Sequence, residues 1–295
     1  MVLVDQHRLT MENLDIKKWV EDASKEQTEF RAAVHTLFWA ISNSEFLRER
    51  MYIKGGLLLA LRYQSTRFTR DADFSTSEMY VEFEKDKFLA ELKVRLSVAV
   101  ESLDYNLDCR ILSHKVNPSG DDKSFQTLSI KIGHAYKGSK KHKTLIRGNC
   151  PSVLEIDYSF NEQSRKIDVV CIDGENNNLL AYSLPDLIAE KFRSIIQQKV
   201  RKRVRRQDAY DIFILMSKIE LEKKKLKKDV LASLLLKSES RNLKVDRRSL
   251  RDEEVIRRSK ADYETLAQEI EGELQPFEEV YGKIRKYYES LPWDD

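Results

Sequence analysis

Two aspartates separated by a single residue, Asp71 and Asp73, are the side chains of this sequence best suited to chemistry. On an extended strand, residues two positions apart point to the same side, so the two carboxylates would lie next to each other. Mg²⁺ is commonly held by one or two carboxylates together with waters and substrate phosphates. The pair therefore predicts a strand that presents a metal ion to a phosphorylated substrate.

A pair of glycines precedes these aspartates, in the segment Lys54-Gly55-Gly56. Glycine lets a backbone come close to a phosphate. The apolar run that follows is expected to begin a helix, whose first amides would face that phosphate. A glycine turn followed by paired aspartates is the layout of a polymerase-β-type nucleotidyltransferase, so the order of these residues indicates that class of enzyme.

A third carboxylate is expected on a neighbouring strand, in the run LEIDY at 154–158. The apolar residues of this run share one face of a strand, and Glu155 and Asp157 share the other. Either acid could bind the metal or accept the proton of an attacking hydroxyl as a general base. We favour Asp157 and keep Glu155 as the alternative.

The elements that must position these acids follow from the apolar spacing. Four strand-like runs lie between residues 107 and 172. Residues 137–147 among them are expected to form a mobile basic loop, and 238–258 a polar linker or exposed helix. Helical spacing is found at 14–49, 81–100, 183–200, 207–219, 222–237 and 261–290. We expect an α+β fold: a catalytic lobe over 1–175 with a mixed sheet flanked by helices, and a helical lobe over 176–295 that completes the active-site cleft.

Composition restricts the class of partner only weakly. The chain has 295 residues, 34% of them charged, yet its net charge is only +3, so overall charge does not indicate nucleic-acid binding. One local run, KVRKRVRR at 199–206, carries six basic residues in eight. Such a run is either a solvated face or a surface for an RNA backbone, and charge alone does not decide between them.

Cysteine usage and hydropathy indicate where the protein works. The three cysteines are far apart and lack metal-binding spacing, which favours a reducing cytosol. No apolar run is long enough for a membrane helix. The first residues also lack the basic start and apolar core of a signal peptide. We expect a cytoplasmic protein without a membrane partner.

Four motifs together resemble a known family. KGG at 54–56, RFTRDADF at 67–74, EKFR at 190–193 and RQDAYDI at 206–212 occur in the order found in AbiEii/AbiGii nucleotidyltransferase toxins. These toxins belong to type IV toxin–antitoxin and phage-defence systems and include the MenT toxins. The resemblance spans roughly residues 30–216.

The resemblance implies a role for each motif residue. Asp71, Asp73 and Asp157 would bind Mg²⁺ or Mn²⁺, and Asp211 would contribute to the active site with support from Asp208. Lys191 would contact the phosphates of a nucleoside triphosphate. The other expected nucleotide-binding residues are Lys54, Gly55, Gly56, Arg67 and Thr69.

The function that follows is transfer of a nucleoside monophosphate from a nucleoside triphosphate to an acceptor. The resemblance implies that the acceptor is the 3′ end of tRNA, that translation is blocked, and that a cognate antitoxin protein is a partner. Two alternatives stay open. One is nucleotidylation of a partner protein, and the other is a non-catalytic, nucleotide-sensing subunit of a defence complex.

Overall fold

The computed structural model describes residues 12–120, 123–174 and 177–294. Within these residues, eight strands form one sheet in the order β1-β7-β8-β2-β3-β6-β5-β4. The pairs β1/β7, β2/β8 and β3/β6 are parallel and the remaining pairs are antiparallel, which confirms the expected mixed sheet. The strands are β1 (Glu12–Leu14), β2 (Tyr52–Lys54), β3 (Asp71–Ser75), β4 (Leu107–Asn117), β5 (Thr127–Tyr136), β6 (Val153–Ser159), β7 (Ile167–Ile172) and β8 (Asn178–Tyr182).

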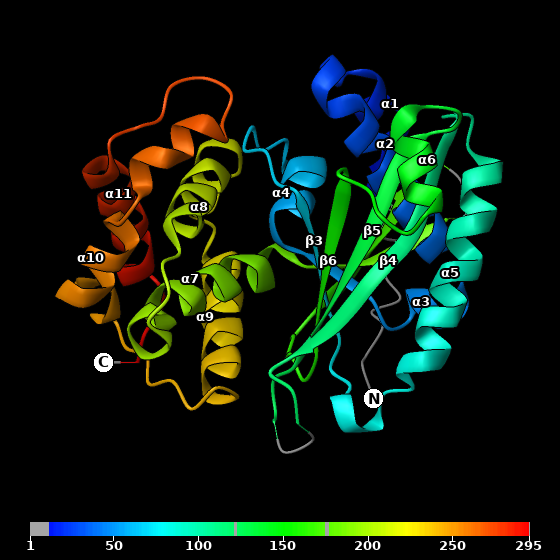
Figure 1. The fold of residues 1–295 in the computed structure, drawn as a ribbon. Coiled ribbons are helices and arrows are strands. Elements are labelled where there is room, and N and C mark those ends of the chain that lie inside the picture. Colours follow the sequence, from blue (N-terminus) through cyan, green and yellow to red (C-terminus); the bar gives the residue numbers. More distant parts are fainter. Residues whose placement is uncertain (1–11, 121–122, 175–176, 295) are drawn as a thin grey trace.

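The helices fall into two groups on either side of the molecule (Figure 1). The sheet side carries α1 (Ile16–Glu21), α2 (Lys25–Ser42), α3 (Glu45–Arg48), α4 (Gly55–Tyr63), α5 (Lys85–Ser102) and α6 (Lys140–Ile146). The other side consists of α7 (Leu184–Arg201), α8 (Arg206–Lys218), α9 (Lys224–Glu239), α10 (Glu253–Lys260) and α11 (Phe277–Glu289). The expected helical C-terminal part is therefore present.

The core of the sheet side lies between the strands and helices α2 and α5. Phe74 of β3 meets Phe38 of α2 edge-on at 6.1 Å, and Tyr158 of β6 stacks on Phe88 of α5 at 5.3 Å, measured between ring centroids. Because side chains alternate along a strand, this packing turns the acidic residues of β3 and β6 to the opposite face of the sheet. The apolar face thus orients the acids.

The helix expected over 14–49 is three helices, α1, α2 and α3. Asp15 and Ser44 accept hydrogen bonds from the backbone amides at the starts of α1 and α3, and Ser24 precedes α2 in an extended conformation. Capping residues of this kind begin new helices. Apolar spacing alone did not reveal the breaks, because buried residues continue on both sides of them.

Two other segments differ from expectation. The chain was expected to turn helical after 176, but strand β8 pairs with β7 and β2 inside the sheet. The division of the chain at 175 stays a prediction. The segment 137–147, expected to be a mobile loop, contains helix α6, which is capped by Ser139 and anchored by the buried Leu145.

The C-terminal segments are shorter helices than their spacing predicted. The segment 238–258, expected to be a polar linker or exposed helix, contains a 3₁₀ turn at Ser249–Arg251 and the start of α10, so part of it is helical. The segment 261–290 divides into a 3₁₀ turn at Tyr263–Gln268 and helix α11. Among the described residues, none of the helices is both long and apolar enough to cross a membrane.

Candidate active site

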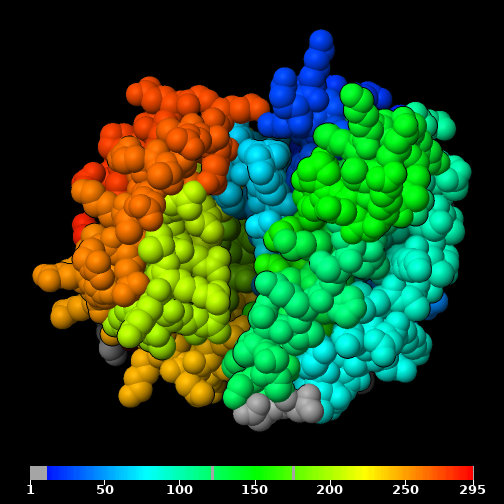
Figure 2. Space-filling model, in the orientation of Figure 1, coloured from blue at the N-terminus to red at the C-terminus, as the bar shows by residue number. Residues whose placement is uncertain are grey.

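A cavity of about 670 Å³ lies where the sheet meets helices α7 and α8. Figure 2 shows the two sides of the molecule meeting along a furrow. Strands β2, β3, β5 and β6 contribute one wall, and α7, α8 and the residue Arg241 beyond α9 contribute the other. The lining is mostly charged and polar, which suits a charged ligand.

The acidic residues predicted from the sequence lie on two paired parallel strands. Asp73 of β3 is directly opposite Asp157 of β6, and Asp71 is opposite Glu155. Asp71, Asp73 and Asp157 all line the cavity. Glu155 is exposed outside the lining and forms an ion pair with Lys131, at 2.9 Å between Nζ and Oε1. Position thus favours Asp157 over Glu155 as the third acid.

The positive charge near Asp71 and Asp73 does not outweigh the effects of burial and of the neighbouring acids. Burial raises the pKa of Asp73 to about 6, and the neighbouring acids Asp157, Glu190 and Asp71 add to this effect, while Lys54 opposes it. Burial and the same kind of repulsion from Asp157 also raise the pKa of Asp71. Carboxylates held close together at such cost attract a cation.

The donor set fits a magnesium or manganese ion. Among the described residues, there is no group of three His, Cys, Asp or Glu side chains arranged to hold a metal ion by themselves. Mg²⁺ does not need such a cage, because it usually keeps waters and takes one or two carboxylates and substrate phosphates. Asp73 and Asp157 supply hard oxygen donors side by side on paired strands. Metal binding at these residues stays a prediction.

The glycine pair starts helix α4 and makes room for an acid. Gly55 has a φ of +70°, and a Cβ at this position would lie 1.9 Å from Oδ2 of Asp73. A Cβ at Gly56 would lie 3.0 Å from Nη2 of Arg67 and from the side chain of Thr69. The sequence predicted that the glycines admit a phosphate. The structure adds a second reason, because Gly55 also admits the carboxylate of Asp73.

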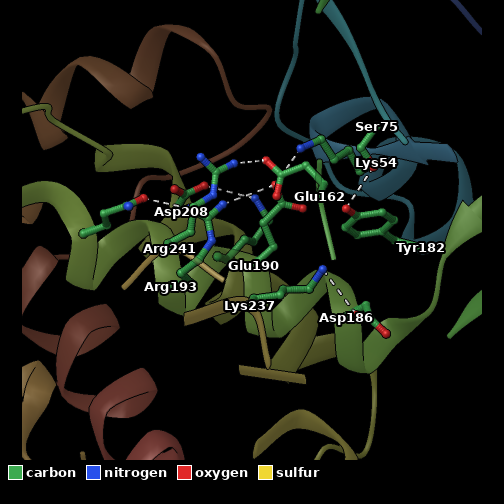
Figure 3. Close-up of polar contacts among 12 residues, drawn as sticks. Lys54, Ser75, Glu162, Tyr182, Asp186, Glu190, Arg193, Asp208, Lys237 and Arg241 are labelled. Carbon is green, nitrogen blue, oxygen red and sulfur yellow. Dashed lines mark hydrogen bonds and ion pairs between the residues drawn. The ribbon is translucent and has the colours of Figure 1, made fainter. Parts of the chain in front are cut away.

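Lys54 is buried at the end of β2 and is held by acids (Figure 3). Its Nζ lies 2.8 Å from Oε1 of Glu190 on α7. Burial by itself would lower the pKa of Lys54, but the charges of Glu190 and Glu162 raise it above its usual range. Lys54 therefore carries its positive charge beside Asp73, its partner across the β2/β3 ladder.

A second acidic group, Asp208 and Asp211, lies on helix α8 and is bound to positively charged side chains. Asp211 binds Arg67 through two hydrogen bonds of 2.8 and 3.0 Å, and Lys191 donates to Asp211 at 2.7 Å and to Asp208 at 3.2 Å. Burial would raise the pKa of Asp211, but Arg67 and Lys191 lower it to about 2. Asp211 lies behind the cavity wall, and it holds Arg67 and Lys191 at that wall.

Thr69 and Lys191 were expected to bind the nucleotide, and the structure places both in the cavity lining. Strand β3 begins at Asp71, so Thr69 is not on the strand with the two aspartates, although it lines the cavity beside Gly56. Lys191 lines the cavity too, but it is already bound to two aspartates. Its contact with a phosphate stays a prediction.

Two arginines at the cavity were not assigned a role from the sequence. The side chains of Arg193 on α7 and Arg241 after α9 are each only 6% exposed. Nε of Arg193 and both Nε and Nη1 of Arg241 have no hydrogen-bond partner. Arg241 pairs with Glu162 and lies 3.5 Å from the ring centroid of Phe125. Arg193 lies inside one of the motifs of the resemblance, whereas Arg241 lies in the segment expected to be a polar linker or exposed helix.

The fold and the site define the class of protein as a nucleotidyltransferase. The family model described as nucleotidyl transferase AbiEii toxin, Type IV TA system, matches residues 39–283, so the chain belongs to that family of toxins. The resemblance found in the sequence is confirmed. A comparison with curated proteins finds no match.

Two solved structures share the fold over nearly the whole chain. MenT4, a nucleotidyltransferase toxin from Mycobacterium tuberculosis, is 14% identical with a TM-score of 0.54, over 95% of this chain and 90% of that one. JHP933 from Helicobacter pylori is 13% identical with a TM-score of 0.50, over 92% of this chain and 93% of that one. These likenesses confirm the expected α+β nucleotidyltransferase fold.

Proposed function

We propose that this chain transfers a nucleoside monophosphate from a nucleoside triphosphate to the 3′ end of tRNA and thereby blocks translation. One observation carries the proposal: Asp71, Asp73 and Asp157 line a single cavity together with Arg193 and Arg241, two buried arginines that keep unpaired N–H groups. The acids suit a divalent cation and the arginines suit phosphate oxygens. A nucleoside triphosphate with a bound metal ion carries both a cation for the acids and phosphate oxygens for the arginines.

In the proposed step, an oxygen of the acceptor hydroxyl bonds to the α-phosphorus of the donor. The bond from that phosphorus to the oxygen bridging to the β-phosphate breaks, and pyrophosphate leaves with the bonding electrons. The hydroxyl proton passes to a carboxylate, for which Asp157 is best placed. Bound Mg²⁺ or Mn²⁺ would neutralise the triphosphate and stabilise the attacking and leaving oxygens.

The residues of this chain would hold the donor from two directions. The unpaired N–H groups of Arg193 and Arg241 are suited to charge-assisted hydrogen bonds with phosphate oxygens. Lys191 and the first amides of α4, at Gly55 and Gly56, would face the phosphates from the other walls of the cavity. Such fixed donors lower the barrier because they need no reorganisation during the reaction.

Family membership and local charge support the RNA acceptor and the partner. The family is one of type IV toxin–antitoxin systems, which implies a cognate antitoxin protein. Four arginines of the basic run at 199–206 border the cavity and could bind an RNA backbone: Arg201, Arg203, Arg205 and Arg206. We place this activity in the cytoplasm, where tRNA is found.

The test is label transfer by the purified protein. Protein, Mg²⁺ and total RNA would be incubated with each α-³²P nucleoside triphosphate in turn, and the experiment repeated with Mn²⁺. We expect label in the tRNA band with wild type, none with Asp73→Asn, and full label with Glu155→Gln. Glu155 is the matched control, because it is an acid on the same face of the sheet but outside the cavity.

The other outcomes separate the alternatives. Label that resists ribonuclease and is lost to protease would replace the RNA acceptor with a protein acceptor. An absence of label in both RNA and protein, with nucleotide binding retained, would instead support a nucleotide-sensing subunit and overturn the proposed transfer.

A further inference from the structure

A second cavity, of about 350 Å³, adjoins the active-site cavity. The two cavities share a partition built from Arg67, Phe68 and Thr69 together with Gln268 and Glu269. The halves of this partition come from distant parts of the chain. The backbone N–H of Phe68 donates to the carbonyl of Glu269 at 2.6 Å, so the partition is itself ordered.

The walls of the second cavity include three aromatic residues. Trp19 of α1, Phe30 of α2 and Phe68 of the partition line it, and each is half-buried rather than enclosed. Phe30 and Phe68 meet edge-on with ring centroids 5.5 Å apart. The guanidinium of Arg31 lies 4.7 Å from the ring centroid of Trp19. The cavity therefore presents flat faces suited to stacking by another planar group.

The two arginines at this cavity, Arg31 and Arg67, already make hydrogen bonds or ion pairs. Arg31 donates to the carbonyl of Trp19 and to Oε1 of Gln27, both at 2.7 Å. Arg67 is bound to Asp211 and also lies 3.7 Å from Glu269. With its cations occupied, the cavity suits a neutral planar ring better than a phosphate group.

We propose that this second cavity binds an unpaired nucleobase of the RNA acceptor, stacked against Trp19. The inference rests on the RNA acceptor of the proposed function and adds a specific contact to it. Proteins recognise unpaired RNA by stacking its bases on aromatic and arginine side chains. The amides of Gln27, Gln64 and Gln268 at the cavity offer donors and acceptors for the edge of a base.

The partition lies where a single RNA strand would pass from the second cavity to the active-site cavity. Arg70 is exposed, lines the active-site cavity, and lies 5.9 Å from the ring centroid of Phe68. Its guanidinium is therefore placed to meet the phosphate that links the bound base to the next nucleotide. The strand would cross the partition there and bring its 3′ hydroxyl to the acids of the active site.

The test uses wild-type protein and altered RNA, so it does not depend on a variant folding. A tRNA acceptor with an abasic residue at each of its last four positions in turn would be assayed for label transfer. We expect one position to raise the KM for RNA about 5- to 150-fold, the equivalent of one base stacked on an aromatic side chain. The KM for the nucleoside triphosphate should stay unchanged.

Trp19→Leu supplies the coupled measurement. This variant should raise the KM for intact RNA by a similar factor, and the sensitive abasic position should then have no further effect. Trp293→Leu is the matched control, because Trp293 packs on Tyr288 in the helical part and lines neither cavity. It should leave the KM for RNA unchanged.

Each outcome decides between the two proposals. Should wild type label RNA while no abasic position matters, or while the abasic and Trp19→Leu effects multiply, the base site is overturned and the transferase function stands. Should wild type label no RNA at all, the proposed acceptor fails and the base site fails with it.

Discussion

Two groups of aspartates lie at the active-site cavity or directly behind its wall. Their side chains are chemically the same, but their electrostatic surroundings are opposite. On the strands, burial and neighbouring acids raise the pKa of Asp73 to about 6. On helix α8, Arg67 and Lys191 outweigh burial and lower the pKa of Asp211 to about 2. The strand acids are short of positive charge, whereas the helix acids are bound to it.

This contrast is what we would expect if the strand acids bind a cation and the helix acids hold the side chains around them. An acid held without a partner costs stability, and such strain is common where a protein binds cations. Removal of an acid that is bound to two buried cations leaves those charges uncompensated, which destabilises the fold. We therefore expect substitutions on the strands to affect activity, and substitutions at Asp211 to affect stability first.

The largest effect is expected from Asp73→Asn. If Asp73 binds the metal ion as proposed, its loss should lower transfer by about 10³-fold or more, since a bound ion supplies several kcal/mol. The free energy of unfolding at pH 7 should stay equal or increase. Folding raises the pKa of Asp73 from its ordinary value of 3.8 to about 6, so its ionisation destabilises the folded state progressively from pH 3.8 to 6 and fully above pH 6.

Transfer assays and chemical denaturation would be made on the same preparation. An Asp73→Asn protein that unfolds more readily than wild type would remove the distinction between the two groups of acids.

Asp211→Asn should show the reverse balance. It leaves Arg67 and Lys191 buried without their shared partner, which should cost about 3–5 kcal/mol of stability. The control is Asp229→Asn, whose side chain is 42% exposed and 3.9 Å from Arg165, and which should cost less than about 1 kcal/mol. Urea unfolding of both variants measures the difference, and equal losses would argue against a supporting role for Asp211.

The ion pairs of Asp211 with Arg67 and Lys191 also predict that stability depends on pH. Folding lowers the pKa of Asp211 from its ordinary 3.8 to about 2, so its stabilisation is complete above pH 3.8. That stabilisation is lost as the pH falls through 3.8 towards 2. Over this range of falling pH, the melting temperature should decrease less steeply for Asp211→Asn than for wild type. Parallel curves would mean that Asp211 is not the group responsible.

Within the strand group, Asp157 and Glu155 sharpen the comparison. Asp157→Asn should lower transfer by about 10²- to 10⁴-fold, as expected for a lost general base. Glu155→Gln should leave transfer unchanged, because Glu155 is exposed and bound to Lys131 outside the cavity. Steady-state rates at saturating nucleotide would decide, and equal losses would return Glu155 to the site.

The smallest effect is expected from the glycine turn. Gly55→Ala and Gly148→Ala both place a side chain at positive φ, which costs about 1–2 kcal/mol. A Cβ at Gly55 would in addition overlap Asp73, whereas one at Gly148 meets no atom within 4 Å. We expect both variants to lose stability, but only Gly55→Ala to lose transfer activity. Retained activity in Gly55→Ala would show that Asp73 can move without harm.

The sequence by itself was enough to predict the paired aspartates Asp71 and Asp73, the class of enzyme, and most of the helices and strands. Residue spacing places Asp71 and Asp73 on one face of a strand whatever surrounds it, and apolar periodicity reports which face is buried. Helical spacing likewise predicted the helix over 183–200, and the structure shows α7 beginning after Ser183, whose side chain accepts a hydrogen bond from the amide of Asp186.

Only the tertiary structure decided what pairs with what. Strand β8 was missed because its position between β7 and β2 depends on partners distant in sequence. The separation of Asp157 from Glu155 needed the register of β3 against β6 and the outline of the cavity. Arg241 approaches Glu162 and Phe125 through long-range packing that no local pattern records. Charge balance is a property of neighbours in space, so aspartates of the same chemistry are short of positive charge on the strands and bound to it on helix α8.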